Sequence, residues 1–363
     1  MEIVYLVKDH DAATVEGWSP LAREVSRLGY QVRLEPGWNL RSLARELEQQ
    51  PAAVLHCIGW PPGDLEPIVA LKSRRPFSLI LELPRQQASW WSRVLGRRAA
   101  RRWSGPGGDP AIAGFVARSR SGRRLIEKVF GADPSRVLCL SLGVDAEHFQ
   151  FHPEARGWWR ERLGLGHWET LCLQLGPFRS QAEVEMIFAA GGHMLREGRA
   201  LLALVGNGPW TWRELVREQA RRLGVLHRVK FLGEIPSRDL PGLYSAGDLG
   251  FALGADPALA AAAMACRLPL LPSAEAGLAW WRERSLGSEA RVEVGSGNGL
   301  RRQLTRLVLE PSLRRQQGEV ARCFIEAECA WPAQAEKMCR WYRELAVTPA
   351  AGEMESREER LAA

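Results

Sequence analysis

Short apolar runs alternate with amphipathic runs along the first part of the chain. The runs at 3–7 (IVYLV), 52–60 (AAVLHCIGW) and 77–84 (FSLILELP) are almost continuously apolar, as in strands that are covered on both faces. Between them, PLAREVSRLG (20–29) places apolar residues at helical spacing, and Gly29 is a suitable C-cap. This alternation predicts an α/β fold with a parallel sheet and right-handed helical crossovers.

The same alternation starts again after residue 151. A segment at 152–166 is typical of a connection between two lobes, and LCLQLGP (171–177) is the first strand of the new series. Because open parallel sheets bind ligands at the carboxyl ends of their strands, we expect a ligand crevice between the facing lobes. The expected parts are two doubly wound, Rossmann-like domains at 1–150 and 151–330, an amphipathic C-terminal helix at 331–347 and a polar tail at 348–363.

Composition narrows the class of protein. The 363-residue chain is 46% hydrophobic, which is enough to fill two cores. Its seven cysteines are scattered without a CxxC pair, which favours free thiols in a reducing compartment over a disulfide framework. The start, MEIVYLVKDH, predicts a strand rather than a signal peptide, and no run of about 18 apolar residues occurs. We therefore expect a cytoplasmic protein without a membrane span.

Positive charge is concentrated in one arginine-rich segment. The formal net charge is +7, and SRVLGRRAARRW (92–103) follows Trp90 and Trp91. One hypothesis is peripheral binding to anionic lipid at the inner face of the membrane, and the alternative is a solvated helix. The arginines concerned are Arg97, Arg98, Arg101 and Arg102. Nucleic acid is not an expected partner, because no binding motif is present and the charge is modest for this length.

Several ordered segments resemble the family 4 glycosyltransferases, which have the two-lobed GT-B fold. SLGVDAEHFQ (141–150) is similar to the family's lobe junction, and 201–253 is similar along its whole length. MACRLPLL (264–271) fits the segment that follows a site carboxylate. The segments 310–322 and 327–345 resemble the terminal helices, the last of which crosses back onto the first lobe. Together these matches cover most of 137–347 in family order.

The resemblance implies transfer of a sugar from a nucleotide-sugar to an acceptor, with retention of anomeric configuration. The donor would lie against the second lobe, and the first lobe would hold a glycan or lipid-linked acceptor. The donor diphosphate needs cationic side chains and free backbone N–H groups, because charge develops on the leaving phosphate. The resemblance implies neither a metal ion nor a resident cofactor.

Most positions that carry charge in the family do not carry it here. Pro177 stands at the diphosphate-binding arginine, and Gln181 or Ala182 stands at the lysine; Arg179 is the cation left in that loop. His56 is a weak candidate for a first-lobe histidine near the donor sugar and acceptor. The residues that replace the two family glutamates are Gly254 and Ala262.

Two charged residues stand close to the emptied carboxylate positions. Asp256 is a weak candidate for a moved carboxylate, although an aspartate before Pro257 is more simply a helix cap. Arg267 replaces a usual glycine and is a candidate for donor binding.

Other family features are retained. Gly206 and Gly208 can form the turn below the nucleotide, and Gly233 and Glu234 match a segment whose backbone contacts the base. Asp248 also fits the family pattern, with a structural cap as the alternative. Turns of this kind preserve a fold as readily as a site.

Two functions remain open on the sequence. Loss of one preorganised electrostatic contact costs about 3–4 kcal/mol of transition-state stabilisation, and four such groups are replaced here. The first hypothesis is a working, divergent glycosyltransferase that uses substitutes such as Arg179, Arg267, Asp256 or Glu234. The second is a catalytically inactive relative, a pseudoenzyme, that binds a protein partner or a membrane surface.

Overall fold

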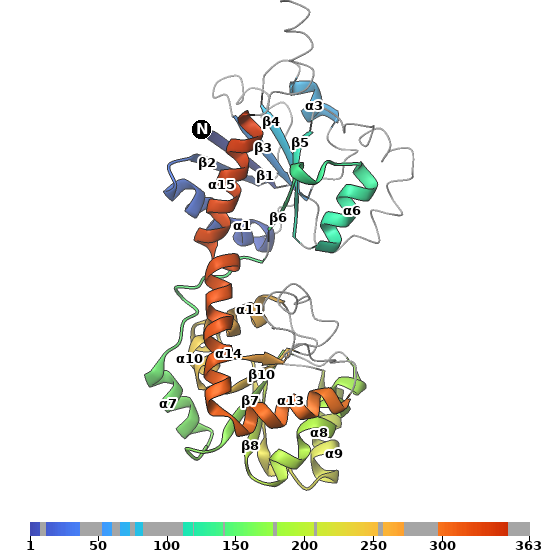
Figure 1. The fold of residues 1–363 in the computed structure, drawn as a ribbon, viewed down its shortest axis with the longest axis vertical. Helices are drawn as coiled ribbons and strands as arrows, with labels where there is room; N and C mark the ends of the chain where they lie inside the picture. Colours follow the sequence, from blue (N-terminus) through green and yellow to red (C-terminus); the bar gives the residue numbers. More distant parts are fainter. Residues whose placement is uncertain are drawn as a thin grey trace, which may run out of the picture. The chain divides into compact units, whose positions relative to one another are not determined.

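The computed structural model describes two units of the chain, each with its own sheet (Figure 1). The first unit consists of Met1–Ser141 with Trp331–Ala363, and the second of Leu142–Ala330. The described residues are 1–7, 12–36, 53–59, 66–72, 77–82, 112–118, 120–140, 142–176, 180–206, 209–252, 257–271 and 297–347. By their contacts, residues 142–150 belong to the second unit. The predicted boundary at residue 150 between two independently folding domains stays a prediction.

The first unit is built on a six-stranded parallel sheet in the order β2-β1-β3-β4-β5-β6. Its strands are β1 Glu2–Val7, β2 Gln31–Pro36, β3 Val54–Ile58, β4 Ser78–Glu82, β5 Ile112–Ala117 and β6 Val137–Cys139. Its helices are α1 Ala12–Arg27, α3 Glu66–Lys72, α6 Arg120–Phe130, the short η2 Pro134–Arg136 and α15 Trp331–Val347. The predicted parallel sheet is therefore confirmed.

Helix α15 completes the first unit from the far end of the sequence, as predicted (Figure 1). Its buried face, including Met338, Trp341 and Tyr342, joins the core formed by β1 and α1. Trp341 reaches Gly114 of β5 so closely that a Cβ on Gly114 would lie 2.5 Å from its ring. Gly114 is therefore required for the docking of α15.

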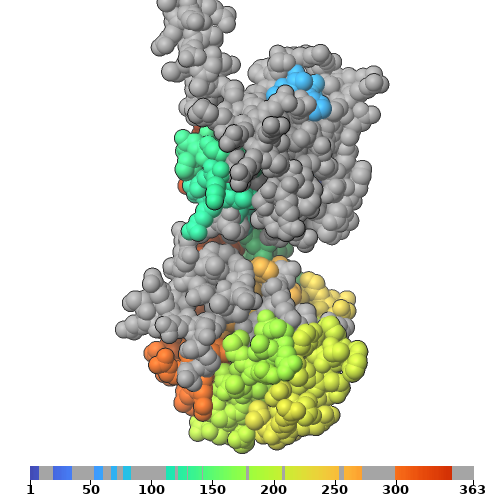
Figure 2. Space-filling model, turned by 90° about the vertical axis from the view of Figure 1, so that its right-hand side faces the viewer, coloured from blue at the N-terminus to red at the C-terminus, as the bar shows by residue number. Residues whose placement is uncertain are grey.

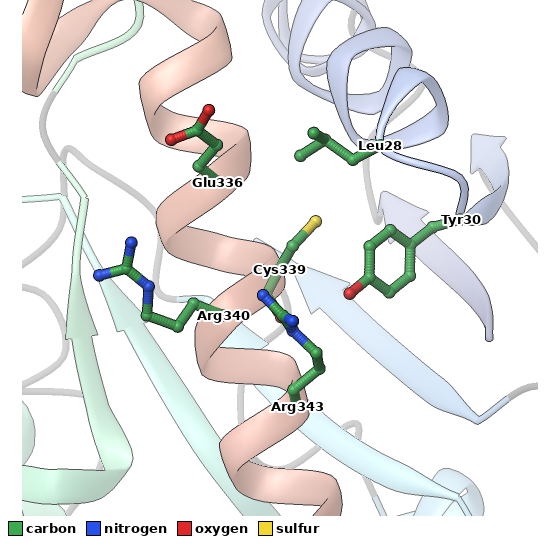
Figure 3. Close-up of a pocket in the computed structure, with 6 residues that line it drawn as sticks. All are labelled: Leu28, Tyr30, Glu336, Cys339, Arg340 and Arg343. Carbon is green, nitrogen blue, oxygen red and sulfur yellow. The ribbon is translucent and has the colours of Figure 1, made fainter.

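A small hollow of about 280 Å³ separates part of α15 from the end of α1 (Figure 3). The thiol of Cys339 points between Leu28 and Tyr30, while Arg340 and Arg343 extend from the helix. Burial raises the pKa of Cys339 to about 11, so its thiol is neutral near neutral pH.

Buried polar side chains link α15 to the sheet. His56 Nδ1 lies 2.8 Å from the hydroxyl of Tyr342 on α15. On the other side, His56 Nε2 lies 3.8 Å from Glu82, which accepts two hydrogen bonds from Arg118 at 2.8 and 3.2 Å. His56 is fully buried, and burial, with a smaller effect of Arg118, lowers its pKa to about 3.

The second unit has a five-stranded parallel sheet in the order β11-β10-β7-β8-β9. Its strands are β7 Thr170–Leu175, β8 Ala200–Val205, β9 Val229–Gly233, β10 Leu249–Phe251 and β11 Leu270–Leu271. Its helices are α7 Pro153–Arg162, α8 Gln181–Arg196, α9 Trp210–Arg222, α10 Leu240–Ala246, α11 Pro257–Ala265, α13 Gly297–Leu309 and α14 Pro311–Phe324. Short turns are η3 Leu226–Arg228, η4 Ser237–Asp239 and a π-helical turn at Ile325–Cys329.

Successive strand residues enter two cores on opposite faces of this sheet. Leu171 and Leu173 of β7 pack with α7, α10 and α11, whereas Cys172 packs with α8, α9 and α13. Figure 2 shows α8 and α9 side by side on one face of the unit. This doubly wound arrangement confirms the predicted Rossmann-like fold.

All seven cysteines are free thiols, and five of them are buried. Among the described residues, no helix is long and apolar enough to cross a membrane. The same part of the chain holds no cluster of three or more His, Cys, Asp or Glu side chains suited to a metal ion.

The segment at 152–166, expected to be a connection, contains helix α7. Trp159 is the buried residue of this helix, so its apolar face is small. The helix lies against α10, where a Cβ on Gly242 would be 3.0 Å from Ala155. Polar contacts with α10 and β10 hold it in place, and a hydrophobic pattern does not reveal such contacts.

Asp248, the residue before β10, makes the main polar contact of α7. Its carboxylate accepts hydrogen bonds from Arg156 at 2.6 Å, from Arg160 at 2.7 Å and from the Leu171 amide at 2.9 Å. Burial acts to raise the pKa of Asp248, but the two guanidiniums and the hydrogen bonds outweigh it and lower that pKa. Asp248 therefore has a structural role, one of the two alternatives considered from the sequence.

Replacing Asp248 by alanine is expected to destabilise the second unit by about 3 kcal/mol, because two partly buried guanidiniums lose their counter-charge. Urea unfolding followed by circular dichroism measures the change. Glu197→Ala removes the carboxylate of an exposed pair with Arg199 and should change stability by less than about 0.5 kcal/mol. Equal effects of the two substitutions would contradict a structural role for Asp248.

The buried His56 makes the first unit sensitive to acid. Its folded pKa of about 3 lies below the ordinary value of about 6.5, so between these values the unfolded chain binds the extra proton. Stability therefore falls as the pH drops below about 6.5, by roughly 2 kcal/mol at about pH 5. Urea unfolding across this range should show a steeper pH dependence in the parent protein than in His56→Gln. Equal slopes would show that this histidine is not the cause.

Candidate functional site

Three strands of the second unit end at glycines with left-handed backbone. Gly176 after β7, Gly206 after β8 and Gly233 at the end of β9 have φ values of 78°, 99° and 69°. The strands are parallel neighbours, so these glycines lie together at one edge of the sheet, here called the carboxyl edge. Such φ values are strained for residues with side chains, which explains the glycines.

Backbone hydrogen bonds tie the carboxyl edge together. Gly206 N–H donates to the carbonyl of Gly233 at 2.7 Å, and Gly176 N–H donates to Val205 at 3.1 Å. A Cβ on Gly206 would lie 3.7 Å from the Cα of Gly176, so the two chains approach closely. Gly206 and Gly233 are half-buried, so their backbone is partly accessible at this edge, whereas Gly176 is buried.

Two helices begin at this edge, and their first turns differ. The Ser180 hydroxyl caps α8 by accepting a hydrogen bond from the Glu183 amide. Helix α9 begins after Pro209, and no side chain of the described residues caps it. Its first turn contains no acidic residue. The exposed N–H groups and partial positive charge of α9 therefore suit an anionic group.

The structure brings part of the predicted donor site together. Gly206, Gly233 and the exposed Glu234 follow the ends of neighbouring strands. Trp210, which the sequence analysis did not select, is 74% exposed at the first position of α9. In the sequence, the motif GNGPW is the feature that points to Trp210, because Pro209 marks the start of the helix.

Comparisons with known proteins give the evolutionary context. No family model matches the chain. A GDP-mannose-dependent α-(1-6)-phosphatidylinositol monomannoside mannosyltransferase from Mycolicibacterium smegmatis is 34% identical over 167 residues, covering 45% of this chain and 41% of that protein. A D-inositol 3-phosphate glycosyltransferase from Frankia alni is 28% identical over 268 residues, covering 68% and 62%. The chain thus spans about two fifths of the length of the first of these relatives.

Solved structures share the architecture. A glycosyltransferase from Rickettsia africae superposes with a TM-score of 0.69 at 13% identity, covering 96% of this chain and 99% of that one. A sucrose-phosphate synthase from Thermosynechococcus elongatus gives 0.64 at 16% identity, covering 95% and 99%. This chain is a divergent relative of the family 4 glycosyltransferases. Its GT-B fold is the predicted one.

In this glycosyltransferase relative, the described positions that carry charge in the family are uncharged. Ala262 is 6% exposed within α11, in a row of buried alanines. Gln181 begins α8 and donates to Glu185 one turn later. Four other residues of the predicted site lie outside the described residues: Arg179, Gly208, Gly254 and Asp256. Arg97, Arg98, Arg101 and Arg102 of the predicted membrane surface lie outside them as well.

His56 is in the core of the first unit rather than on its surface. Its exposure is 0%, and its ring nitrogens face Tyr342 and Glu82. His56 therefore contacts α15 inside the core. Its predicted role near the donor sugar and the acceptor stays a prediction.

Arg267 lies near the amino-terminal ends of the strands of the second sheet, opposite the carboxyl edge. It follows the end of α11, which leads back from the carboxyl edge to the start of β11. Its guanidinium is 3.1 Å from Glu319 of α14 and lies over the ring of Phe151. Its φ of 63° lies in the left-handed region that favours glycine, which explains why the family usually has a glycine at this position. Donor binding by Arg267 is untested, and its observed contacts are with α14 and Phe151.

Replacing Arg267 by glycine is expected to leave stability unchanged or raise it by up to about 1 kcal/mol, because relief of backbone strain offsets a weak exposed ion pair. Arg267→Ala removes the same ion pair but keeps the strain, so it should be less stable than Arg267→Gly by about 1 kcal/mol. Thermal unfolding of both variants measures the difference. An alanine variant as stable as the glycine variant would show that the left-handed backbone carries no strain.

Proposed function

We propose that this chain binds a nucleotide-sugar at the carboxyl edge of the second unit and transfers the sugar, with retention, to a glycan or lipid-linked acceptor. The observation that carries the proposal is the row of left-handed glycines Gly176, Gly206 and Gly233 beside the N-terminus of α9. Backbone N–H groups at a helix start are suited to a phosphate. The curated relatives named above support a donor of this class.

The roles of the chain's own residues follow from their positions. Gly206 and Gly233 let a nucleotide approach the backbone, and Glu234 is placed to contact the base or ribose. The uncapped start of α9 would stabilise negative charge on the diphosphate as the sugar leaves. Because Ala262 supplies no carboxylate, we expect slow transfer compared with enzymes that retain the family's glutamates.

A second candidate function is that of a pseudoenzyme which binds nucleotide or a protein partner without turnover. The buried, uncharged Ala262 and the distance of Arg267 from the carboxyl edge favour this alternative. Membrane-surface binding through Arg97, Arg98, Arg101 and Arg102 is compatible with either function and stays a prediction.

Nucleotide binding distinguishes a glycosyltransferase or a nucleotide-binding pseudoenzyme from a protein that has this fold but binds no nucleotide. GDP-mannose, UDP-glucose and the free diphosphates are added to the full chain, and thermal unfolding is followed. At least one of them should raise the unfolding temperature. Gly206→Ala should weaken its binding at least tenfold, or about 1.4 kcal/mol, because it distorts the backbone at the carboxyl edge.

Gly224→Ala is the matched control. Gly224 also has a positive φ, 70°, but it follows the far end of α9 and its added Cβ meets nothing within 4 Å. This variant should lose comparable stability yet bind nucleotide normally. If no nucleotide binds, or if both variants bind like the parent, the proposed site is wrong. Release of free sugar or a glycosylated acceptor supports transfer, whereas binding without either product supports the pseudoenzyme.

A further inference from the structure

An open hollow of about 840 Å³ lies on the second unit beside α7. Its walls come from α7, the chain before it, and the segment that runs from Ile235 through η4 into α10. The hollow is within the size range of small-molecule sites, about 300–1,000 Å³. Its lining includes Glu147, His148, Trp158, Arg162, Arg238 and Asp239.

An exposed indole forms one wall of the hollow. Trp158 is 53% exposed, while its neighbour Trp159 is buried and packs edge-on against it with ring centroids 5.0 Å apart. The guanidinium of Arg162 lies 5.2 Å from the Trp158 ring and helps to orient it. A large, oriented aromatic surface next to a hollow is a recognition feature, since indole combines apolar area with a polar N–H.

The walls are held by hydrogen bonds, so the hollow is formed before any ligand arrives. The Asp145 carboxylate accepts from the amides of Glu147 and His148 at 3.2 and 2.9 Å. The Ser245 hydroxyl of α10 accepts from the His152 amide at 2.9 Å. Preformed walls reduce the entropy lost on binding.

The charges that line the hollow cancel. Glu147 and Asp239 supply two carboxylates, and Arg162 and Arg238 supply two guanidiniums. An anionic ligand such as phosphate or a lipid headgroup would meet as much negative as positive charge. A neutral ligand with many hydroxyl groups fits better, because carboxylates accept and guanidiniums donate hydrogen bonds to hydroxyls.

We propose that this hollow is a binding site for a neutral saccharide, with one sugar ring stacked on Trp158. The hydroxyl groups of the sugar would hydrogen-bond to Glu147, Asp239 and Arg238. This inference does not depend on catalysis at the carboxyl edge: its residues differ from those proposed to hold the donor. It gives the second unit a means to hold a glycan.

Binding of neutral trisaccharides to the full chain tests the proposal. Mannotriose, maltotriose and cellotriose serve as probes in saturation-transfer NMR and calorimetry. At least one should bind, and Trp158→Ala should lower its affinity tenfold or more. Trp168→Ala is the matched control, because Trp168 is 81% exposed on the same unit but does not line the hollow. This control should bind like the parent.

A second variant guards against a folding defect in Trp158→Ala. Glu147→Gln with Asp239→Asn keeps the indole and should lower affinity at least threefold. Nucleotide-induced thermal shifts should persist in every variant, so failure here is distinguishable from failure of the proposed function. The proposal is overturned if no trisaccharide binds at millimolar concentration, if inorganic phosphate competes with the sugar, or if the two tryptophan variants bind alike.

Discussion

The three-way contact of Asp248 with Arg156, Arg160 and the Leu171 amide organises the second unit. It joins α7, a helix with a small apolar face, to the neighbouring strands β7 and β10, so α7 is positioned by charge as well as by the burial of Trp159. Arg156 also donates to the carbonyls of Ser245, Ala246 and Gly247 at the end of α10. One buried carboxylate thus helps to set the position of α7, which lines the hollow beside Trp158, relative to strands β7 and β10.

The functional picture depends on a contrast between backbone and side chains. At the carboxyl edge the backbone features of a phosphate site are present, namely left-handed glycines and a helix start that no described side chain caps. The side chains that would add fixed charge are replaced, as the buried Ala262 shows. In the proposed site the backbone contacts the nucleotide, whereas the replaced side chains would contribute both to binding and to stabilising the transition state. Binding can therefore outlast catalysis on this scaffold.

Much of the fold was predictable because parallel strands are read from continuous apolar runs. The two sheets, the crossing of α15 onto the first unit and the turns at Gly206 and Gly233 follow from that pattern and from the family resemblance. Helix α7 was not predicted, because Arg156 and Arg160 are held by Asp248, which lies 92 and 88 positions further along the chain. For the same reason the sequence did not show that His56 is a core residue under α15, or that Arg267 contacts Glu319.

The first unit is discontinuous in sequence, since α15 supplies part of the core around Tyr5 and His56. During synthesis, the ribosome makes residues 1–141 and then the whole second unit before it reaches Trp331. Until then, the nascent first unit has an uncovered apolar face and a histidine without its tyrosine partner. Translation order therefore makes the second unit the first to be completed, and the amino-terminal sheet has to remain soluble until the last helix emerges.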